Sequence, residues 1–128
     1  KSGVEIAWRC RALGMDVIAV DAHDVEAEPV LEDVWPLSRL NELLESSDFV
    51  IVTVPYTPAN ENMLGEVELA LMKPSAYLIV TSRGRIVEHN ALVAALKDGT
   101  IAGAGLDAVI EEPFPADNDQ LGLHHVFL

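Results

Sequence analysis

The chain has 128 residues, half of them hydrophobic, and a formal net charge of −13 at pH 7. This length indicates one globular domain that buries about two-thirds of the surface of its unfolded chain. The acidity argues against a nucleic-acid or anionic-membrane surface, and no apolar run reaches the roughly 18 residues that cross a bilayer. The single cysteine, Cys10, excludes an internal disulfide and suits the reducing cytoplasm.

The first predicted element is a helix over residues 4–13 that ends at Gly14, because glycine readily adopts the conformation of a helix C-cap. Its apolar residues recur at helical spacing and predict a buried stripe formed by Ile6, Ala7, Cys10 and Leu13. Cys10 is therefore expected to be structural rather than reactive. Trp8 points away from the stripe, either as an isolated exposed aromatic residue or as a contact for a partner.

A buried strand is expected next, over residues 15–21, and it ends on the acid Asp21. Residues 22–36 contain several acids and two prolines. This composition predicts a loop with one short edge strand near residues 30–34.

The following segments predict a helix and then a fully buried strand. Ser38 is the expected N-cap of a helix that runs through Glu45. Residues 49–54 are apolar except for one threonine, as expected for a parallel strand covered on both faces. Pro55 and Pro58 end this strand in a loop.

The second half of the chain alternates helices and strands. The expected elements are a helix at 66–72, a strand at 77–80, a helix at 88–97 capped by Gly99, a strand at 101–109, a loop at 111–119 and the start of a strand at 126–128. Alternation of this kind predicts an α/β fold, in which helices cover both faces of a doubly wound parallel sheet.

The turn Thr81-Ser82-Arg83-Gly84-Arg85 follows the predicted strand at 77–80 directly. Open α/β sheets bind ligands in the crevice outside the carboxyl ends of their strands. A guanidinium there can hold a carboxylate through two hydrogen bonds and keeps its charge at any working pH. By itself the turn fits two interpretations, an anion site and a surface turn that contains two arginines.

Five segments carry more specific motifs. They are Gly3-Val4-Glu5-Ile6-Ala7, Val17 to Asp21, Val54-Pro55-Tyr56-Thr57-Pro58, Met72-Lys73-Pro74 through Arg83-Gly84-Arg85-Ile86-Val87, and Gly105-Leu106-Asp107 through Glu112-Pro113. Each segment is a weak signal alone, but their order and spacing resemble the D-isomer-specific 2-hydroxyacid dehydrogenase family over nearly the whole chain. The resemblance implies a Rossmann-like dinucleotide-binding domain over residues 1–128, incomplete at its first strand.

The resemblance assigns catalytic roles to two residues. Arg83 would bind the carboxylate of the substrate. Glu112 would pair with the family's catalytic histidine and raise its pKa, although without the resemblance an ordinary acid in the acidic loop is the favoured interpretation. That histidine would follow the last strand, beyond Leu128. His124 and His125 precede that strand and are expected to be turn residues that share no metal ion.

The implied cofactor is NAD. Asp21 would bind the hydroxyls of the adenosine ribose and disfavour the 2′-phosphate of NADP, although a solvated acid at a strand end is the alternative. Val54 and Pro55 would form the wall of the adenine site, and Asp107 would lie near the nicotinamide carboxamide. The full implied set of cofactor-binding residues is Gly3, Asp21, Val54, Pro55, Thr57, Thr81, Ser82 and Asp107.

The sequence also departs from the family pattern. Val80 stands where the family usually has asparagine, and Ala108-Val109-Ile110 replaces its usual V-F-E. These changes bear on the details of the substrate pocket. The family's first strand and the first two fingerprint glycines would precede Lys1. Without that strand, the strands at 17–21 and 49–54 would each expose an apolar edge, which a second copy or another segment could cover.

The resemblance implies transfer of a hydride between nicotinamide and a small 2-hydroxy or 2-oxo acid, in a cytoplasmic homodimer. The 128 residues alone are expected to show no turnover, because the proton-carrying histidine and the phosphate loop are not among them. Two other hypotheses remain open at this point: a non-catalytic, NAD-responsive interaction module, and a truncated protein that forms a structural dimer.

Overall fold

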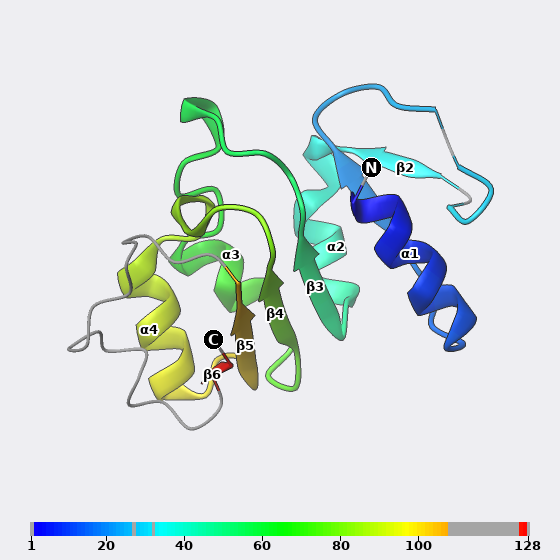
Figure 1. Cartoon of the computed structure of the whole chain (residues 1–128). Helices are drawn as coiled ribbons and strands as arrows, with labels where there is room; N and C mark the ends of the chain where they lie inside the picture. The colour runs from blue at the N-terminus through cyan, green and yellow to red at the C-terminus, as the bar shows by residue number, and fades with distance from the viewer. Residues whose placement is uncertain (1, 27, 32, 108–125, 128) are drawn as a thin grey trace. The chain divides into compact units, whose positions relative to one another are not determined.

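The computed structural model describes residues 2–26, 28–31, 33–107 and 126–127. The chain divides into two compact units, Lys1–Leu43 and Leu44–Leu128. Figure 1 colours the elements of both units from blue at the N-terminus to red at the C-terminus.

The first unit contains a helix, α1 (Ser2–Ala12), and a two-stranded parallel sheet of β1 (Ala19–Asp21) and β2 (Val34–Pro36). The predicted helix is confirmed, and Gly14 has the positive φ of 83° that its capping role requires. The predicted stripe is only partly correct. Ala7 is buried and Ile6 and Cys10 are half-buried, but Leu13 is 80% exposed because it lies beyond the last residue of α1.

Both strands of this unit are short. β1 was expected over residues 15–21, but its only partner in the two-stranded sheet is the three-residue β2, so the ladder extends only from Ala19 to Asp21. The edge strand expected near residues 30–34 begins at Val34 instead. Val30 and Leu31 are buried and form a small core with Ala7, so their side chains serve packing rather than strand pairing.

The helix α2 (Leu40–Ser46) is preceded by a 3-10 turn, η1 (Leu37–Arg39). The prediction that Ser38 caps the helix is therefore wrong, because Ser38 lies inside this turn. Pro36 occupies the N-cap position with a φ of −66°, so the helical conformation begins before Ser38. Leu44 is completely buried, whereas the other two leucines of the predicted apolar face are half-buried.

The second unit is built on a parallel sheet in the order β3-β4-β5-β6 (Figure 1). The strands are β3 (Phe49–Val52), β4 (Tyr77–Val80), β5 (Gly103–Leu106) and β6 (Val126–Phe127). Each of the four strands was predicted, and β4 has the predicted bounds. β3 and β5 are shorter than expected, because each pairs with β4 over only four residues.

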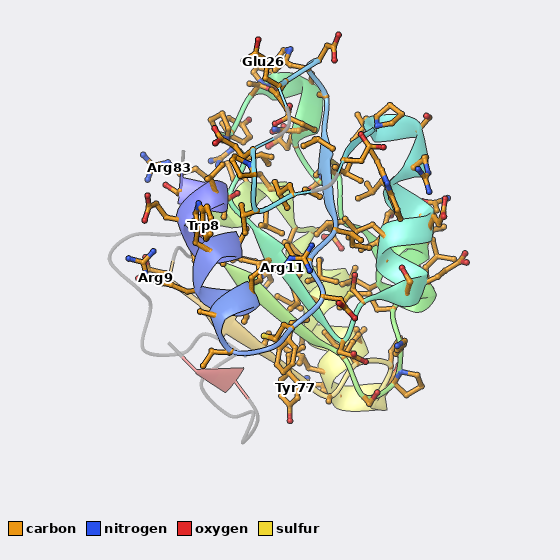
Figure 2. All side chains as sticks on the ribbon, turned by 90° about the vertical axis from the view of Figure 1, so that its right-hand side faces the viewer. Trp8, Arg9, Arg11, Glu26, Tyr77 and Arg83 are labelled. Atoms are coloured by element: carbon orange, nitrogen blue, oxygen red, sulfur yellow. The ribbon has the colours of Figure 1, made fainter. Side chains whose placement is uncertain are left out.

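Two helices pack against each other on one side of this sheet, α3 (Glu66–Leu71) and α4 (His89–Asp98) (Figure 2). Both were predicted. α4 begins after Glu88, which is its N-cap, and ends at Gly99 with a positive φ of 73°. No helix in the described part of the chain is long and apolar enough to span a membrane.

The two faces of the second sheet differ in burial. Val50 and Val52 of β3 are buried, but Phe49 is 47% exposed, because successive side chains of a strand point to opposite faces. The prediction that this strand is covered on both faces is therefore only partly correct, because Ile51, on the same face as Phe49, is half-buried. The Phe49 ring stacks on that of Tyr77, which is 39% exposed, with ring centroids 5.9 Å apart.

Candidate functional site

The carboxyl ends of three neighbouring strands meet at one edge of the second unit's sheet. Val52, Val80 and Leu106 end β3, β4 and β5, and Val80 is aligned with both of the others. The backbone N–H of Thr81 donates to the Val52 carbonyl over 3.2 Å, and that of Asp107 donates to the Val80 carbonyl over 3.0 Å. The predicted residues that follow these strands therefore leave the sheet at the same edge.

The turn after β4 is fixed at its start by a hydrogen bond and at its end by a buried side chain. The Thr81 hydroxyl donates to the Val52 carbonyl over 3.2 Å. Arg83 has an extended backbone and is followed by a 3-10 turn, η3 (Gly84–Ile86), whose last side chain is fully buried. The buried Ile86 thus anchors the turn, while Arg83 stays exposed.

A neighbouring segment holds this turn from outside. The N–H groups of Asn62 and Leu64 donate to the carbonyls of Arg85 and Ile86 over 2.9 and 3.0 Å. Asn62 has a positive φ of 55°, a conformation that asparagine tolerates better than most residues. The Arg85 guanidinium also contacts the Glu61 carboxylate at 3.4 Å. Arg85 therefore has a partner within the fold.

The guanidinium of Arg83, by contrast, has no ion pair among the described residues. The described ion pairs occupy other cations: Arg9 with Glu5, Arg39 with Glu42, Lys73 with Asp48 and Arg85 with Glu61. Figure 2 shows the Arg83 side chain at the surface, extending away from the ribbon. Its position beyond β4 leaves a planar cation available to an anionic ligand.

Beside the Arg83 guanidinium, the turn contains a second polar group without a partner among the described residues, the hydroxyl of Ser82. This hydroxyl is buried and has no hydrogen-bond partner, the one such side-chain atom found in the described part of the chain. Leaving a buried hydroxyl unpaired costs about 1–3 kcal/mol. The sequence pattern of the strands could not predict that this hydroxyl is buried without a partner, because its surroundings depend on how the turn packs.

The loop after β3 contains the predicted adenine wall and is held by a residue that the sequence did not single out. Val54 is half-buried and Pro55 is exposed. The Thr57 N–H donates to Oδ1 of Asn60 over 2.8 Å, and Nδ2 of Asn60 donates to the Pro55 carbonyl over 2.9 Å. The sequence signal for this role of Asn60 was a short capping pattern. Thr57 precedes a 3-10 turn, η2 (Pro58–Asn60), and the last residue of that turn carries a side-chain amide.

Two predicted cofactor residues belong to the first unit. Gly3 lies in the first turn of α1 and is half-buried. Asp21 ends β1, is half-buried, and accepts a hydrogen bond from the His23 N–H over 2.9 Å through one carboxylate oxygen. This bond fixes the orientation of the carboxylate at the strand end.

The arginines of the first unit all have partners. Arg9 pairs with Glu5, and Arg11 donates to the Val30 carbonyl over 3.3 Å. Arg39 forms two hydrogen bonds with Glu42 and lies over the Trp35 ring, with its guanidinium carbon 3.5 Å from the ring centroid. The hydrogen bond from Arg39 holds the pKa of the Glu42 carboxyl below its ordinary value. Acids, by contrast, are frequent in the loop after β1 and are exposed at Asp24, Glu26, Glu28 and Asp33.

Some predicted residues cannot be compared with the structure. Glu112, His124 and His125 lie outside the described residues. His23 is exposed and His89 is half-buried at the start of α4. Within the described ranges, no group of three or more His, Cys, Asp or Glu side chains could hold a metal ion.

Comparison with known proteins gives consistent matches over the whole chain. Residues 1–128 match the family model described as "D-isomer specific 2-hydroxyacid dehydrogenase, NAD binding domain". A glyoxylate reductase from Korarchaeum cryptofilum is 43% identical over 98% of this chain and 38% of the relative. Glyoxylate/hydroxypyruvate reductase B from Enterobacter agglomerans is 48% identical over 97% of this chain and 38% of the relative.

Solved structures agree with these sequence matches. A D-isomer specific 2-hydroxyacid dehydrogenase from Xanthobacter autotrophicus Py2, crystallised with NADPH and MES, superimposes with a TM-score of 0.90 at 30% identity, over 98% of this chain and 39% of that one. The chain spans 38% of the length of the two curated relatives named above.

Proposed function

The chain belongs to the D-isomer-specific 2-hydroxyacid dehydrogenase family, and we propose that it carries the nicotinamide-binding domain of an enzyme that interconverts a small 2-hydroxy acid and its 2-oxo acid. The observation that carries the proposal is the unpaired guanidinium of Arg83 at the carboxyl edge of the sheet. Arg85, two residues further on, already forms an ion pair with Glu61, so Arg83 is the arginine of the turn that is available to a ligand.

Arg83 is the proposed anchor of the substrate carboxylate. A guanidinium can bind both carboxylate oxygens at once, which fixes the plane of the carboxylate and so the position of the adjacent carbon C2. Holding the reacting carbon in one orientation contributes several kcal/mol to catalysis in general. The buried Ile86 and the bonds from residues 62–64 stabilise the turn that carries this arginine.

The residues of the second unit fit a bound nicotinamide nucleotide, which when present supplies or accepts the hydride. The buried, unpartnered hydroxyl of Ser82 supports this fit, because a polar ligand atom would satisfy it. Val54 and Pro55 are the proposed wall against the adenine, Thr57 is a further proposed cofactor contact, and Thr81 and Asp107 are the proposed neighbours of the nicotinamide.

We propose that the cofactor is NAD rather than NADP, held in the first unit by Gly3 and Asp21. The oriented carboxylate of Asp21 can accept hydrogen bonds from ribose hydroxyls and would repel a 2′-phosphate. Every described arginine of the first unit already has a partner, and the loop after β1 adds further negative charge. One solved relative was crystallised with NADPH, so the preference for NAD is proposed from the residues of the present chain and not from that relative.

Two further parts of the proposal concern residues outside the described ranges and the assembly. Glu112 is the proposed partner of a catalytic histidine, whose pKa a nearby carboxylate would raise. We also propose a homodimer in the cytoplasm. The exposed Trp8 and the exposed Phe49–Tyr77 pair support a contact surface.

A direct assay tests this function. The full-length protein, expressed from its complete coding sequence, should oxidise NADH in the presence of glyoxylate or hydroxypyruvate and should prefer NADH to NADPH. Absence of turnover with small 2-oxo acids, together with partner binding that depends on NADH, would instead support a non-catalytic module.

A further inference from the structure

Asn60 uses every polar group it has to hold the loop after β3. Its side-chain oxygen accepts from the Thr57 N–H over 2.8 Å, and its side-chain nitrogen donates to the Pro55 carbonyl over 2.9 Å. Its backbone N–H donates to the Thr57 carbonyl, and its own carbonyl accepts from the Met63 N–H, both over 3.1 Å. One amide side chain thus bridges residues on both sides of Tyr56.

The loop has few other means of holding its shape. Pro55 and Pro58 have no backbone N–H, so neither can donate a hydrogen bond. Strand pairing cannot supply the bonds either, because β3 ends at Val52. The Asn60 side chain is half-buried, and its carboxamide provides the one donor and the one acceptor that this geometry requires.

We propose that Asn60 is a positioning residue that keeps the segment from Val54 to Thr57 in the shape that binds the cofactor. The inference rests on the proposed function, in which Val54 and Pro55 form the wall of the adenine site and Thr57 also contacts the cofactor. Asn60 itself touches neither the reacting atoms nor the substrate carboxylate in this account. Its loss should therefore weaken cofactor binding and leave the chemical step intact.

The test compares Asn60→Ala, Asn60→Ser and a matched control, Asn90→Ala, in the full-length protein. Asn90 is exposed in the first turn of α4 and belongs to the same unit. Asn60→Ala should raise both the Kd and the KM for NADH about tenfold, as expected for the loss of two hydrogen bonds. The kcat at saturating NADH and the KM for the 2-oxo acid should stay within about twofold of wild type.

Two further readouts separate positioning from a general loss of structure. Asn60→Ser has one short hydroxyl, which cannot replace both the bond from the Thr57 N–H and the bond to the Pro55 carbonyl, so it should give an intermediate NADH affinity. The amide of Thr57 should exchange with solvent faster in Asn60→Ala than in wild type or Asn90→Ala, while amides of β4 keep their protection.

The possible results distinguish a failure of the positioning role of Asn60 from a failure of the proposed function. Unchanged NADH affinity in Asn60→Ala, or a fall in kcat with an unchanged KM for NADH, would overturn the positioning role while the proposed function stands. A wild-type protein that binds no NADH would refute the proposed function, and the role of Asn60 would fall with it.

Discussion

Two arginines separated by one glycine have different surroundings in this molecule. Arg85 contacts Glu61, and its carbonyl accepts the Asn62 N–H, so it helps to hold the turn. Arg83 has no described ion pair and lies at the carboxyl edge of the sheet. The same residue type is therefore structural at one position and available for a ligand at the other.

Asp21 gives a prediction about cofactor choice. Asp21→Ser removes the carboxylate that would bind the ribose hydroxyls and repel a 2′-phosphate. We expect the KM for NADH to rise about tenfold and the preference over NADPH to shrink or disappear, since each lost charged hydrogen bond costs about 1.5–3 kcal/mol. Steady-state assays with both nucleotides measure this. An unchanged ratio of the two kcat/KM values would show that Asp21 does not select the cofactor.

Ser82 gives a prediction in which stability and binding change in opposite directions. Ser82→Ala removes a buried hydroxyl that has no partner in the fold. The free energy of unfolding without ligands should stay the same or rise by up to about 1 kcal/mol, whereas NADH affinity should fall severalfold. Denaturant titration and NADH fluorescence measure the two effects. A destabilised variant with normal NADH affinity would indicate that the hydroxyl serves the fold.

The sequence predicted these site residues unequally. The positions of Arg83 and Asp21 could be predicted, because Asp21 ends one apolar strand and Arg83 lies three residues beyond another. Their binding roles come from the resemblance to the family and stay predictions. Asn60 and the unsatisfied state of Ser82 could not be predicted, because both depend on the path of a loop. The role of Glu112 stays a prediction.

At the level of elements, a helix cap makes a separable contribution. The Glu88 carboxylate accepts from the N–H groups of Asn90 and Ala91, over 3.2 and 2.6 Å, at the start of α4. Glu88→Ala should lower the free energy of unfolding by about 0.5–2 kcal/mol, and Glu88→Gln, which keeps an acceptor, should lower it less. Denaturant titrations of both variants test this. Equal losses would mean that the charge, and not the hydrogen bonds, stabilises the helix.

Element boundaries were predictable where local chemistry sets them. Gly14 and Gly99 ended their helices as expected, because both positions have the positive φ that glycine tolerates. The length of β1 was overestimated, because the length of a strand depends on its partner and β2 pairs with β1 over only three residues. The early start of the helical segment before α2 likewise depended on Pro36 rather than on the expected Ser38 cap.

At the level of the whole molecule, alternating helices and strands correctly predicted an α/β fold with parallel sheets, and the Rossmann-like form that the resemblance implied is confirmed by the solved relatives. The exposure of Phe49 could not be predicted in the same way. An apolar segment reads the same whether one or both of its faces are covered, and here the second face is partly exposed. The division into two units was not predicted either.

The proposed homodimer is tested by mass. The full-length protein at micromolar concentration should have twice the mass of its chain by light scattering, because exposed aromatic side chains are enriched at stable contacts. Trp8→Glu and Tyr77→Glu, made separately, show whether either exposed aromatic residue lies in the contact. A monomeric mass across the micromolar range would contradict the proposal.

A comparison of Arg83→Ala with Arg85→Ala shows whether Arg83 anchors the substrate carboxylate. In the full-length protein we expect kcat/KM for glyoxylate to fall by at least about a hundredfold in Arg83→Ala, because each lost hydrogen bond between charged groups costs about 1.5–3 kcal/mol and the guanidinium would form two with the carboxylate. Arg85→Ala breaks only an exposed ion pair and should change kcat/KM by less than about fivefold. NADH affinity should be normal in both variants. Equal losses in the two variants, or full activity in Arg83→Ala, would contradict the account.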